Sequence, residues 1–133
     1  RDRGYGDGNT SVGLLRVDLS GNPIWSKAFG GTMNTKSKMF SEINSNEYIS
    51  VCSQIDYSTN SSNAWLIKIN DNGEIIWEKT FGKYGNDDGF SVAPTLDNGF
   101  IITGRSNSLE SNNESLFDLW ILKTDPNGYS KFD

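Results

Sequence analysis

The sequence has no histidine and a single cysteine, Cys52, among its 133 residues. Without histidine there is no Ser-His-Asp triad, no Cys-His pair and no histidine-ligated metal. One cysteine can form neither a cysteine zinc site nor an internal disulfide. A nucleophilic cysteine also needs an activating base, so Cys52, on an apolar strand, is expected to be a small buried hydrophobe. Most routes to catalysis are therefore closed, and we expect a protein that is not an enzyme.

Long apolar runs and clusters of basic residues are also missing. No run of about 18 apolar residues occurs, so no membrane span is predicted. The 12 Lys and Arg residues are scattered among 17 acidic residues, which gives a formal net charge of -5. Such a chain is not expected to bind nucleic acid. The N-terminus reads RDRGYGDGNT, which is neither a signal peptide nor a start Met, so we expect a piece of a longer protein.

What the sequence does contain is an internal repeat. The segment from Leu14 to Gly30 returns from Leu66 to Gly82, with Leu, Gly, Ile, Trp, Lys, Phe and Gly identical in register. A third copy begins at Trp120. Length differences fall in Asn- and Ser-rich stretches, where loops tolerate insertion. We therefore divide a single repeat domain, 1–133, into a trailing half-unit (1–36) and two full units (37–83 and 84–133).

Each full unit is predicted to hold four short strands, because runs of aromatic and β-branched residues are separated by residues typical of hairpin turns. A repeat of about 50 residues with four strands and a fixed Trp and Gly is typical of a propeller blade. The predicted fold class is all-β, a partial β-propeller of about two and a half blades. Closed propellers need at least about four blades, so we expect either a fragment of a larger propeller or copies that associate to complete one. In the last unit the predicted strands are Gly89 to Thr95, Gly99 to Thr103, Leu119 to Thr124 and Tyr129 to Phe132, separated by the turns Asp97-Asn98-Gly99 and Asp125-Pro126-Asn127-Gly128.

The chain carries Trp77, Lys79, Phe81 and Gly82, followed by Asp87, Gly89 and Ser91. With these motifs the repeat resembles a family of secreted propeller-type repeats that is common on bacterial and archaeal surface proteins. Its consensus reads W-x-K-x-F-G-G, D-x-G-x-S, T-x-D-G-G-x-I-I-x-G and D-x-W-L-I-K-x-D-x-N-G. The first full unit departs from it, with Cys52 at the family Gly and Ala64 in place of the Asp before Trp65. The resemblance implies an extracellular propeller module and carries no common chemistry. The matching residues are Trp77, Lys79, Phe81, Gly82, Asp87, Gly89, Ser91, Thr95, Asp97, Gly99, Ile101, Ile102, Gly104, Asp118, Trp120, Lys123, Asp125, Asn127 and Gly128.

Two acidic segments are the candidate cation sites. Asp87 and Asp88 place two carboxylates side by side in a predicted loop, where they could bind a hard cation, accept sugar hydroxyls or cap a strand end. The segment 70–74 carries part of a calcium-loop pattern, but Lys68 and Lys79 stand where two calcium ligands are needed. A hairpin turn explains that segment. No cofactor is predicted, and Ca²⁺ at Asp87 and Asp88 is the alternative.

Exposed aromatic and polar side chains are the remaining candidates for ligand binding. Tyr57 and Tyr84 lie among Gly, Asn and Ser in predicted loops and could stack on a sugar ring. Arg105, at a predicted strand end, could bind a carboxylate or form a surface ion pair. The tryptophans stand at fixed repeat positions and are instead expected to pack between blades: Trp25, Trp65, Trp77 and Trp120. Three sequons are candidate glycosylation sites, at Asn9, Asn60 and Asn113.

The function predicted from these features is a non-enzymatic binding or scaffold module, secreted or displayed on a prokaryotic cell surface. Its loops would engage a glycan or a protein partner. Two alternatives remain open. Unpaired strand edges could join copies of the chain into a ring or filament, because open edges recruit strands. The chain could also be a fragment of a polysaccharide-acting propeller enzyme whose catalytic residues lie on other blades.

Overall fold

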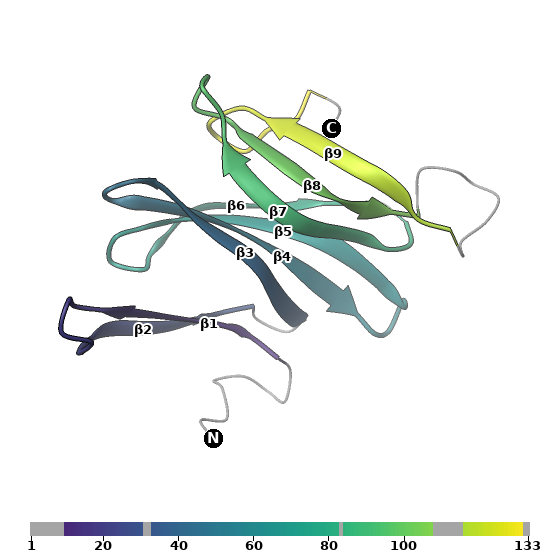
Figure 1. Cartoon of the computed structure of the whole chain (residues 1–133). Coiled ribbons are helices and arrows are strands. Elements are labelled where there is room, and N and C mark those ends of the chain that lie inside the picture. Colours follow the sequence, from purple (N-terminus) through teal and green to yellow (C-terminus); the bar gives the residue numbers. More distant parts are fainter. Residues whose placement is uncertain (1–9, 31–32, 83, 108–115, 132–133) are drawn as a thin grey trace.

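A computed structural model describes residues 10–30, 33–82, 84–107 and 116–131. All the secondary-structure elements of these residues are β-strands, and they form three antiparallel sheets (Figure 1). This confirms the all-β class. No helix in this part of the chain is long and apolar enough to cross a membrane. Sheet A contains β1 (Val12–Val17) and β2 (Pro23–Phe29). Sheet B contains, in spatial order, β3 (Asn34–Asn44), β4 (Glu47–Asp56), β5 (Ser61–Asn70) and β6 (Ile75–Phe81), and sheet C contains β7 (Asp87–Pro94), β8 (Phe100–Ser106) and β9 (Asp118–Thr124).

The observed strands differ from the predicted ones at their ends. β7 begins at Asp87, so the loop predicted for Asp87 and Asp88 is wrong. The reason is pairing: these two residues lie opposite Ser106 and Arg105 of β8, and a strand partner overrides their local turn preference. The fourth predicted strand of the last unit is represented by one bridge between Thr124 and Ser130, and Phe132 lies outside the described residues. Sheet B begins at Asn34, slightly before the predicted unit boundary.

Three hairpin turns share one local construction, in which a side-chain oxygen accepts hydrogen bonds from two backbone amides. Asp18 accepts from Ser20 and Asn22, both at 2.8 Å. Asn70 accepts from Asn72 and Glu74, both at 3.0 Å, which supports the hairpin interpretation of the segment 70–74. In the last unit, Asp125 accepts from Asn127 and Tyr129. Each turn contains a glycine with positive φ, namely Gly21, Gly73 and Gly128.

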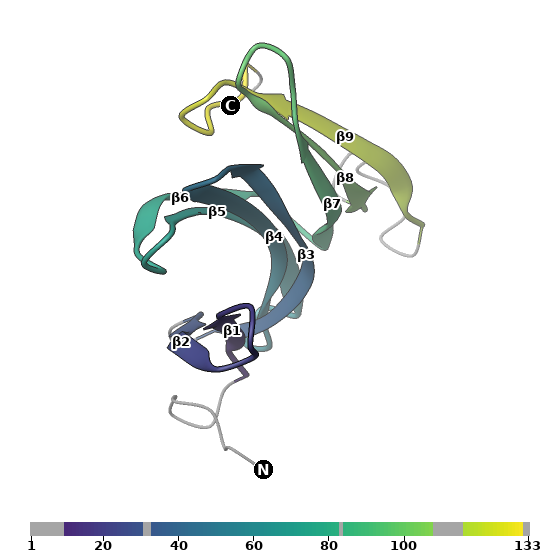
Figure 2. The ribbon, with the colours of Figure 1, turned by 60° about the vertical axis from the view of Figure 1, so that its left-hand side comes forward.

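The three sheets are stacked with sheet B in the middle (Figures 1 and 2). Side chains alternate between the two faces along β4 and β5, so both faces of sheet B carry apolar residues and both are covered. β7 of sheet C packs across β3, β4 and β5. The layer between sheets A and B holds Val12, Phe29, Cys52, Trp65, Ile67 and Ile69; the layer between sheets B and C holds Ile49, Val51, Ala64, Leu66, Phe81, Val92, Phe100, Ile102 and Leu122.

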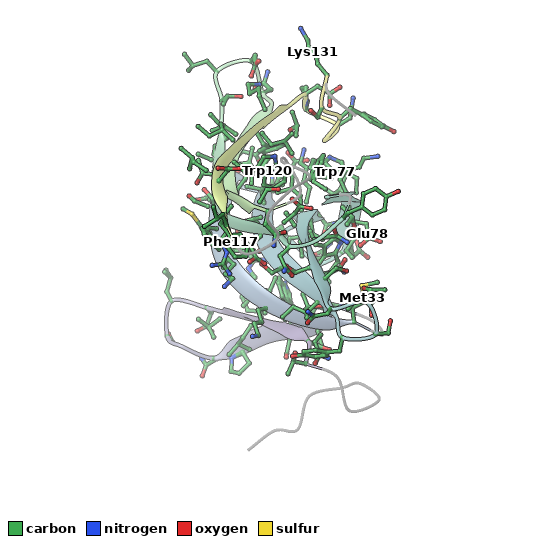
Figure 3. The ribbon with its side chains drawn as sticks, turned by 90° about the vertical axis from the view of Figure 1, so that its right-hand side faces the viewer. Met33, Trp77, Glu78, Phe117, Trp120 and Lys131 are labelled. Atoms are coloured by element: carbon green, nitrogen blue, oxygen red, sulfur yellow. The ribbon has the colours of Figure 1, made fainter. Side chains whose placement is uncertain are left out.

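The tryptophans and the cysteine belong to these layers, as their repeat positions predict. Trp65 is buried in the first layer and Trp25 packs against it. Trp77 and Trp120 pack against the second layer, where sheets B and C meet (Figure 3). Cys52 is fully buried, and burial raises the pKa of its thiol. A buried thiol of this kind is a packing group rather than a nucleophile.

Each sheet is also joined to the next by a tryptophan and a lysine that lie on a turn glycine. Trp25 and Lys27 of β2 lie over Gly73, where an added Cβ would be 2.9 Å from Lys27 Cγ and 3.1 Å from the Trp25 ring. Trp25 Nε1 donates to the carbonyl oxygen of Asp71 at 2.9 Å, and Arg16 forms an ion pair with the carboxylate of Asp71. The contact of a tryptophan and a lysine with a turn glycine recurs one sheet later, with Trp77, Lys79 and Gly128.

Candidate functional site

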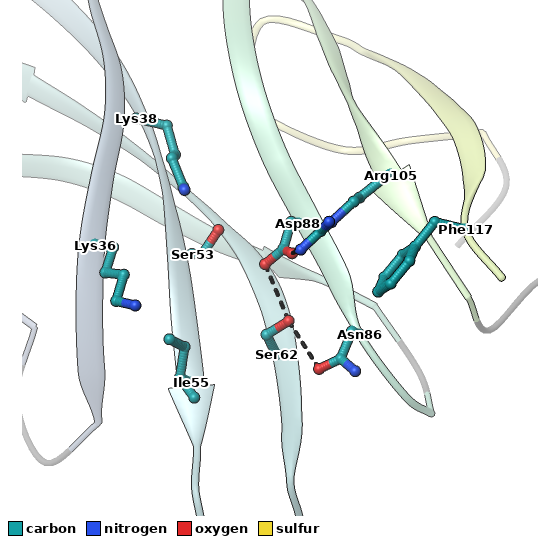
Figure 4. Close-up of a pocket in the computed structure, with 9 residues that line it drawn as sticks. All are labelled: Lys36, Lys38, Ser53, Ile55, Ser62, Asn86, Asp88, Arg105 and Phe117. Atoms are coloured by element: carbon teal, nitrogen blue, oxygen red, sulfur yellow. Dashed lines mark hydrogen bonds and ion pairs between the residues drawn. The ribbon is translucent and has the colours of Figure 1, made fainter. Parts of the chain in front are cut away.

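A polar groove opens where the apolar layer between sheets B and C ends (Figure 4). The β4 side chains that face sheet C are apolar and buried at Ile49 and Val51, and polar at Ser53. The groove has a volume of about 280 Å³ and lies between the strands of sheet B and those of sheet C. Its lining residues are Lys36, Lys38, Ser53, Ile55, Ser62, Asn86, Asp88, Arg105 and Phe117.

One side of the groove is organised by an ion pair between Arg105 of β8 and Asp88 of β7. Nε and Nη2 of Arg105 lie 3.1 and 3.0 Å from Oδ2 of Asp88. Ser62 Oγ lies 3.0 Å from Asp88 Oδ1 and 3.2 Å from Asn86 Oδ1, so its single proton is donated to one of these two oxygens. The Arg105 guanidinium also lies 4.1 Å from the centroid of the Phe117 ring, a cation–π distance. These contacts hold Arg105 in place while 47% of its side chain stays exposed.

The opposite side carries Lys36 and Lys38 of β3. Among the described residues neither ammonium group has a hydrogen-bond or ion-pair partner; Lys38 Nζ lies 5.6 Å from the Phe90 ring centroid. In the described lining, three cationic side chains therefore face one carboxylate, that of Asp88, which is an excess of two positive charges in a chain of formal net charge -5. The groove is electropositive on an otherwise acidic protein, which favours an anionic ligand.

Ser53 is a second sign of a ligand. Its side chain is 98% buried and lies directly across from Lys36 in the β3–β4 pairing. Its Oγ has no hydrogen-bond partner in the part of the chain that the structure describes, and it points into the groove (Figure 4). Buried hydroxyl groups are nearly always satisfied, so one that is left without a partner in a groove calls for a specific explanation.

The structure brings together only some of the predicted ligand-binding residues. Asp88 and Arg105 meet in the groove and form an ion pair, which is one of the two roles that the sequence allowed for Arg105. Asp87 points to the other face of β7, where Ser106 Oγ donates to it, so the two carboxylates do not converge on one cation. Tyr57 lies in the β4–β5 turn and Tyr84 lies before β7; both are exposed and neither lines the groove.

The structure bears on the predicted cation site and on one of the three glycosylation candidates, Asn60. Within the described residues no three acidic, cysteine or histidine side chains gather where they could hold a metal ion. Asn60 is exposed in the β4–β5 turn, with a φ of +52°. Asn9 and Asn113 lie outside the described residues.

Sequence reasoning missed most of the lining residues, among them Lys36, Lys38, Ser53, Ser62 and Phe117. The two lysines carried a usable signal, because residues two apart in a strand share a face, and both precede an apolar strand pattern. Ser53 and Phe117 carried none, since their place in the groove depends on how two sheets stack.

Comparison with models of known protein families found no match, and a search of curated proteins found none either. The chemistry of the groove is therefore the basis for a function.

Proposed function

We propose that the chain is part of a non-enzymatic, secreted or cell-surface binding module built from propeller-type repeats, with its ligand in the groove between sheets B and C. Several features support the repeat architecture. Sheet B has four sequential antiparallel strands, as a propeller blade does. Its two faces are both covered, and the Trp–Lys–Gly contact recurs from one sheet to the next.

The observation that carries the binding proposal is the set of unpartnered polar groups at the groove. Lys36 and Lys38 have no anionic partner among the described residues, and Ser53 Oγ has no partner there either. The two exposed lysines thus have no carboxylate of the described residues as a counter-charge, and the buried Ser53 hydroxyl of the same groove has no hydrogen bond among those residues. An anionic ligand with hydroxyl groups would satisfy all three, because ammonium groups bind anions and a hydroxyl can donate or accept.

Acetate tests the proposal, because it is the carboxylate fragment that acidic sugars and acidic proteins share. In a titration of the ¹⁵N-labelled chain, we expect acetate to shift the backbone amides of Ser53, Asn86 and Arg105, with a Kd on the order of millimolar or weaker for so small a probe. The double variant Lys36→Gln/Lys38→Gln should lose these shifts. Lys131→Gln removes a positive charge outside the groove lining and should keep them. Equal shifts in the double variant, or none in the wild type, contradict the proposal.

A further inference from the structure

The charges in the groove favour an anionic ligand. A guanidinium has five N–H donors, and Asp88 engages Arg105 through Nε and Nη2, which leaves three N–H groups for a ligand. Lys36 and Lys38 add two ammonium groups from the other side. The carboxylate of Asp88 lines the same groove, but the three cationic side chains outnumber it, so the described lining attracts an anion on balance. A carboxylate, whose two oxygens accept charge-assisted hydrogen bonds, fits these donors.

The uncharged lining favours a ligand with hydroxyl groups. Ser53 supplies a buried hydroxyl without a partner among the described residues, and Ser62 Oγ, whose proton is donated to Asp88 or Asn86, supplies a hydrogen-bond acceptor. Asn86 uses its Oδ1 toward Ser62, and its amide nitrogen is turned away from that contact in Figure 4. Ser53 can donate or accept, Ser62 can accept and the Asn86 amide nitrogen can donate, and sugar hydroxyls can pair with all three because they do both.

The rim and the size of the groove favour one ring. Phe117 is 40% exposed beside Arg105 and offers a flat apolar face on which a pyranose can stack. A volume of about 280 Å³ lies just under the ~300–1,000 Å³ typical of ligand pockets, so one substituted ring fits and a longer chain would extend into solvent. A peptide ligand would rely on apolar side-chain pockets, and among the described lining residues only Ile55 and Phe117 are apolar.

We infer that the groove binds an acidic sugar, a pyranose with a carboxylate such as the uronate unit of a polysaccharide, held by its carboxylate between Lys36, Lys38 and Arg105. This inference rests on the proposed function and adds the chemical class of the ligand. Ser53 and Asn86 would contact the ring hydroxyls, and Phe117 would lie against the ring.

Three short probes distinguish an acidic sugar from a neutral sugar and from an acidic peptide: trigalacturonate, galactotriose and triglutamate, respectively. In NMR titrations of the 133-residue chain we expect trigalacturonate to shift the groove amides and to bind at least about tenfold more tightly than either other probe. Lys36→Gln/Lys38→Gln should weaken it at least about tenfold, whereas Lys36→Arg/Lys38→Arg should keep most of the affinity. Ser53→Ala should weaken trigalacturonate about threefold or more and leave acetate unchanged. The control Lys131→Gln should match the wild type.

Each other outcome overturns a defined part of the inference. Tighter binding of triglutamate overturns the sugar, and equal binding of galactotriose overturns the role of the carboxylate; in both cases the groove remains a binding site. Groove shifts with acetate but with none of the three trimers overturn the sugar and leave the proposed function standing. No groove shift with acetate or any trimer overturns both.

Discussion

Three turn glycines have the same backbone conformation and different surroundings. The φ angles of Gly21, Gly73 and Gly128 are +83°, +75° and +80°, a region that L side chains rarely adopt. An added Cβ would lie 2.9 Å from Lys27 Cγ at Gly73 and 2.8 Å from the Trp77 ring at Gly128. At Gly21 no atom of the described residues lies within 4 Å of that position. A substitution at Gly21 therefore measures the cost of the backbone conformation alone, whereas a substitution at Gly73 or Gly128 adds the cost of steric overlap.

Alanine at these positions is expected to destabilise the chain unequally. Gly21→Ala should lower the free energy of unfolding by about 1–2 kcal/mol, the cost of a left-handed L-residue. Gly73→Ala and Gly128→Ala add steric overlap of about 1–3 kcal/mol, for a total of about 2–5 kcal/mol. Urea unfolding of the three variants measures the difference. A loss at Gly21 as large as at Gly73 would contradict this expectation and would indicate that another copy of the chain covers the Gly21 turn.

At the scale of elements, the β7–β8 hairpin is closed by Asp97, which also reaches β9. Lys123 Nζ of β9 lies 2.9 and 2.8 Å from the two carboxylate oxygens of Asp97. Thr95 Oγ1 and the Gly99 amide donate to Oδ1 of the same side chain. The Lys123 hydrogen bonds, followed by those of Thr95 and Gly99, hold the pKa of Asp97 well below its ordinary value of 3.8. The ionised form of Asp97 is thus the one that supports the hairpin.

This lowered pKa predicts a dependence of stability on pH. A carboxyl group whose pKa is lower in the folded state contributes stability that is complete above its ordinary pKa of 3.8 and is lost as the pH falls toward the folded pKa. Asp97→Asn should therefore be less stable than the wild type at pH 6, and the gap should narrow as the pH falls below about 4. Urea midpoints at several pH values measure this gap.

The control for the Asp97 variant is Glu42→Gln, which neutralises an exposed acidic residue of β3. The pKa values of Asp18, Glu47 and Asp56 are also lowered, by hydrogen bonds to neighbouring groups, so both variants retain some pH dependence. Only the difference between Asp97→Asn and the wild type reports on the hairpin. A gap that stays constant down to pH 2 would contradict the role given to the ionised carboxylate.

At the scale of the whole molecule, stability is shared between two separate apolar layers. Ile67 is buried in the layer between sheets A and B, and Ile102 is buried in the layer between sheets B and C. Stacked repeats of this kind are stabilised by contacts between neighbours, so parts of the stack can open independently. The outer sheets are therefore expected to respond to different substitutions.

Amide hydrogen exchange tests this independence. Ile67→Ala and Ile102→Ala each remove a buried side chain, at a cost of about 2–5 kcal/mol. Ile67→Ala should speed exchange in β1 and β2 far more than in β8 and β9, and Ile102→Ala should show the reverse. Uniform acceleration across all three sheets in both variants would mean that the stack opens as one cooperative unit.

The all-β class, the hairpin turns, the buried Cys52 and the packing of the tryptophans could be read from the sequence because their causes are local or repeated. Turn residues act within about four positions, and strand alternation acts within about six. The turn at Asp97 illustrates this, since its hydrogen bonds to Thr95 and Gly99 join near neighbours in the chain. Asp87 and Asp88 were misplaced because their cross-strand partners in β8 are far along the sequence.

The groove was decided by the tertiary structure. Lys36 and Arg105 come from different repeats, and the buried Ser53 lines the groove only because β7 packs across β3, β4 and β5. No local pattern encodes which side chains meet when two sheets stack, since the contact depends on the register and crossing of strands far apart in the chain. Composition and spacing thus define what each segment of this protein can form, and the stacking of the sheets defines which charges and hydroxyls share a site.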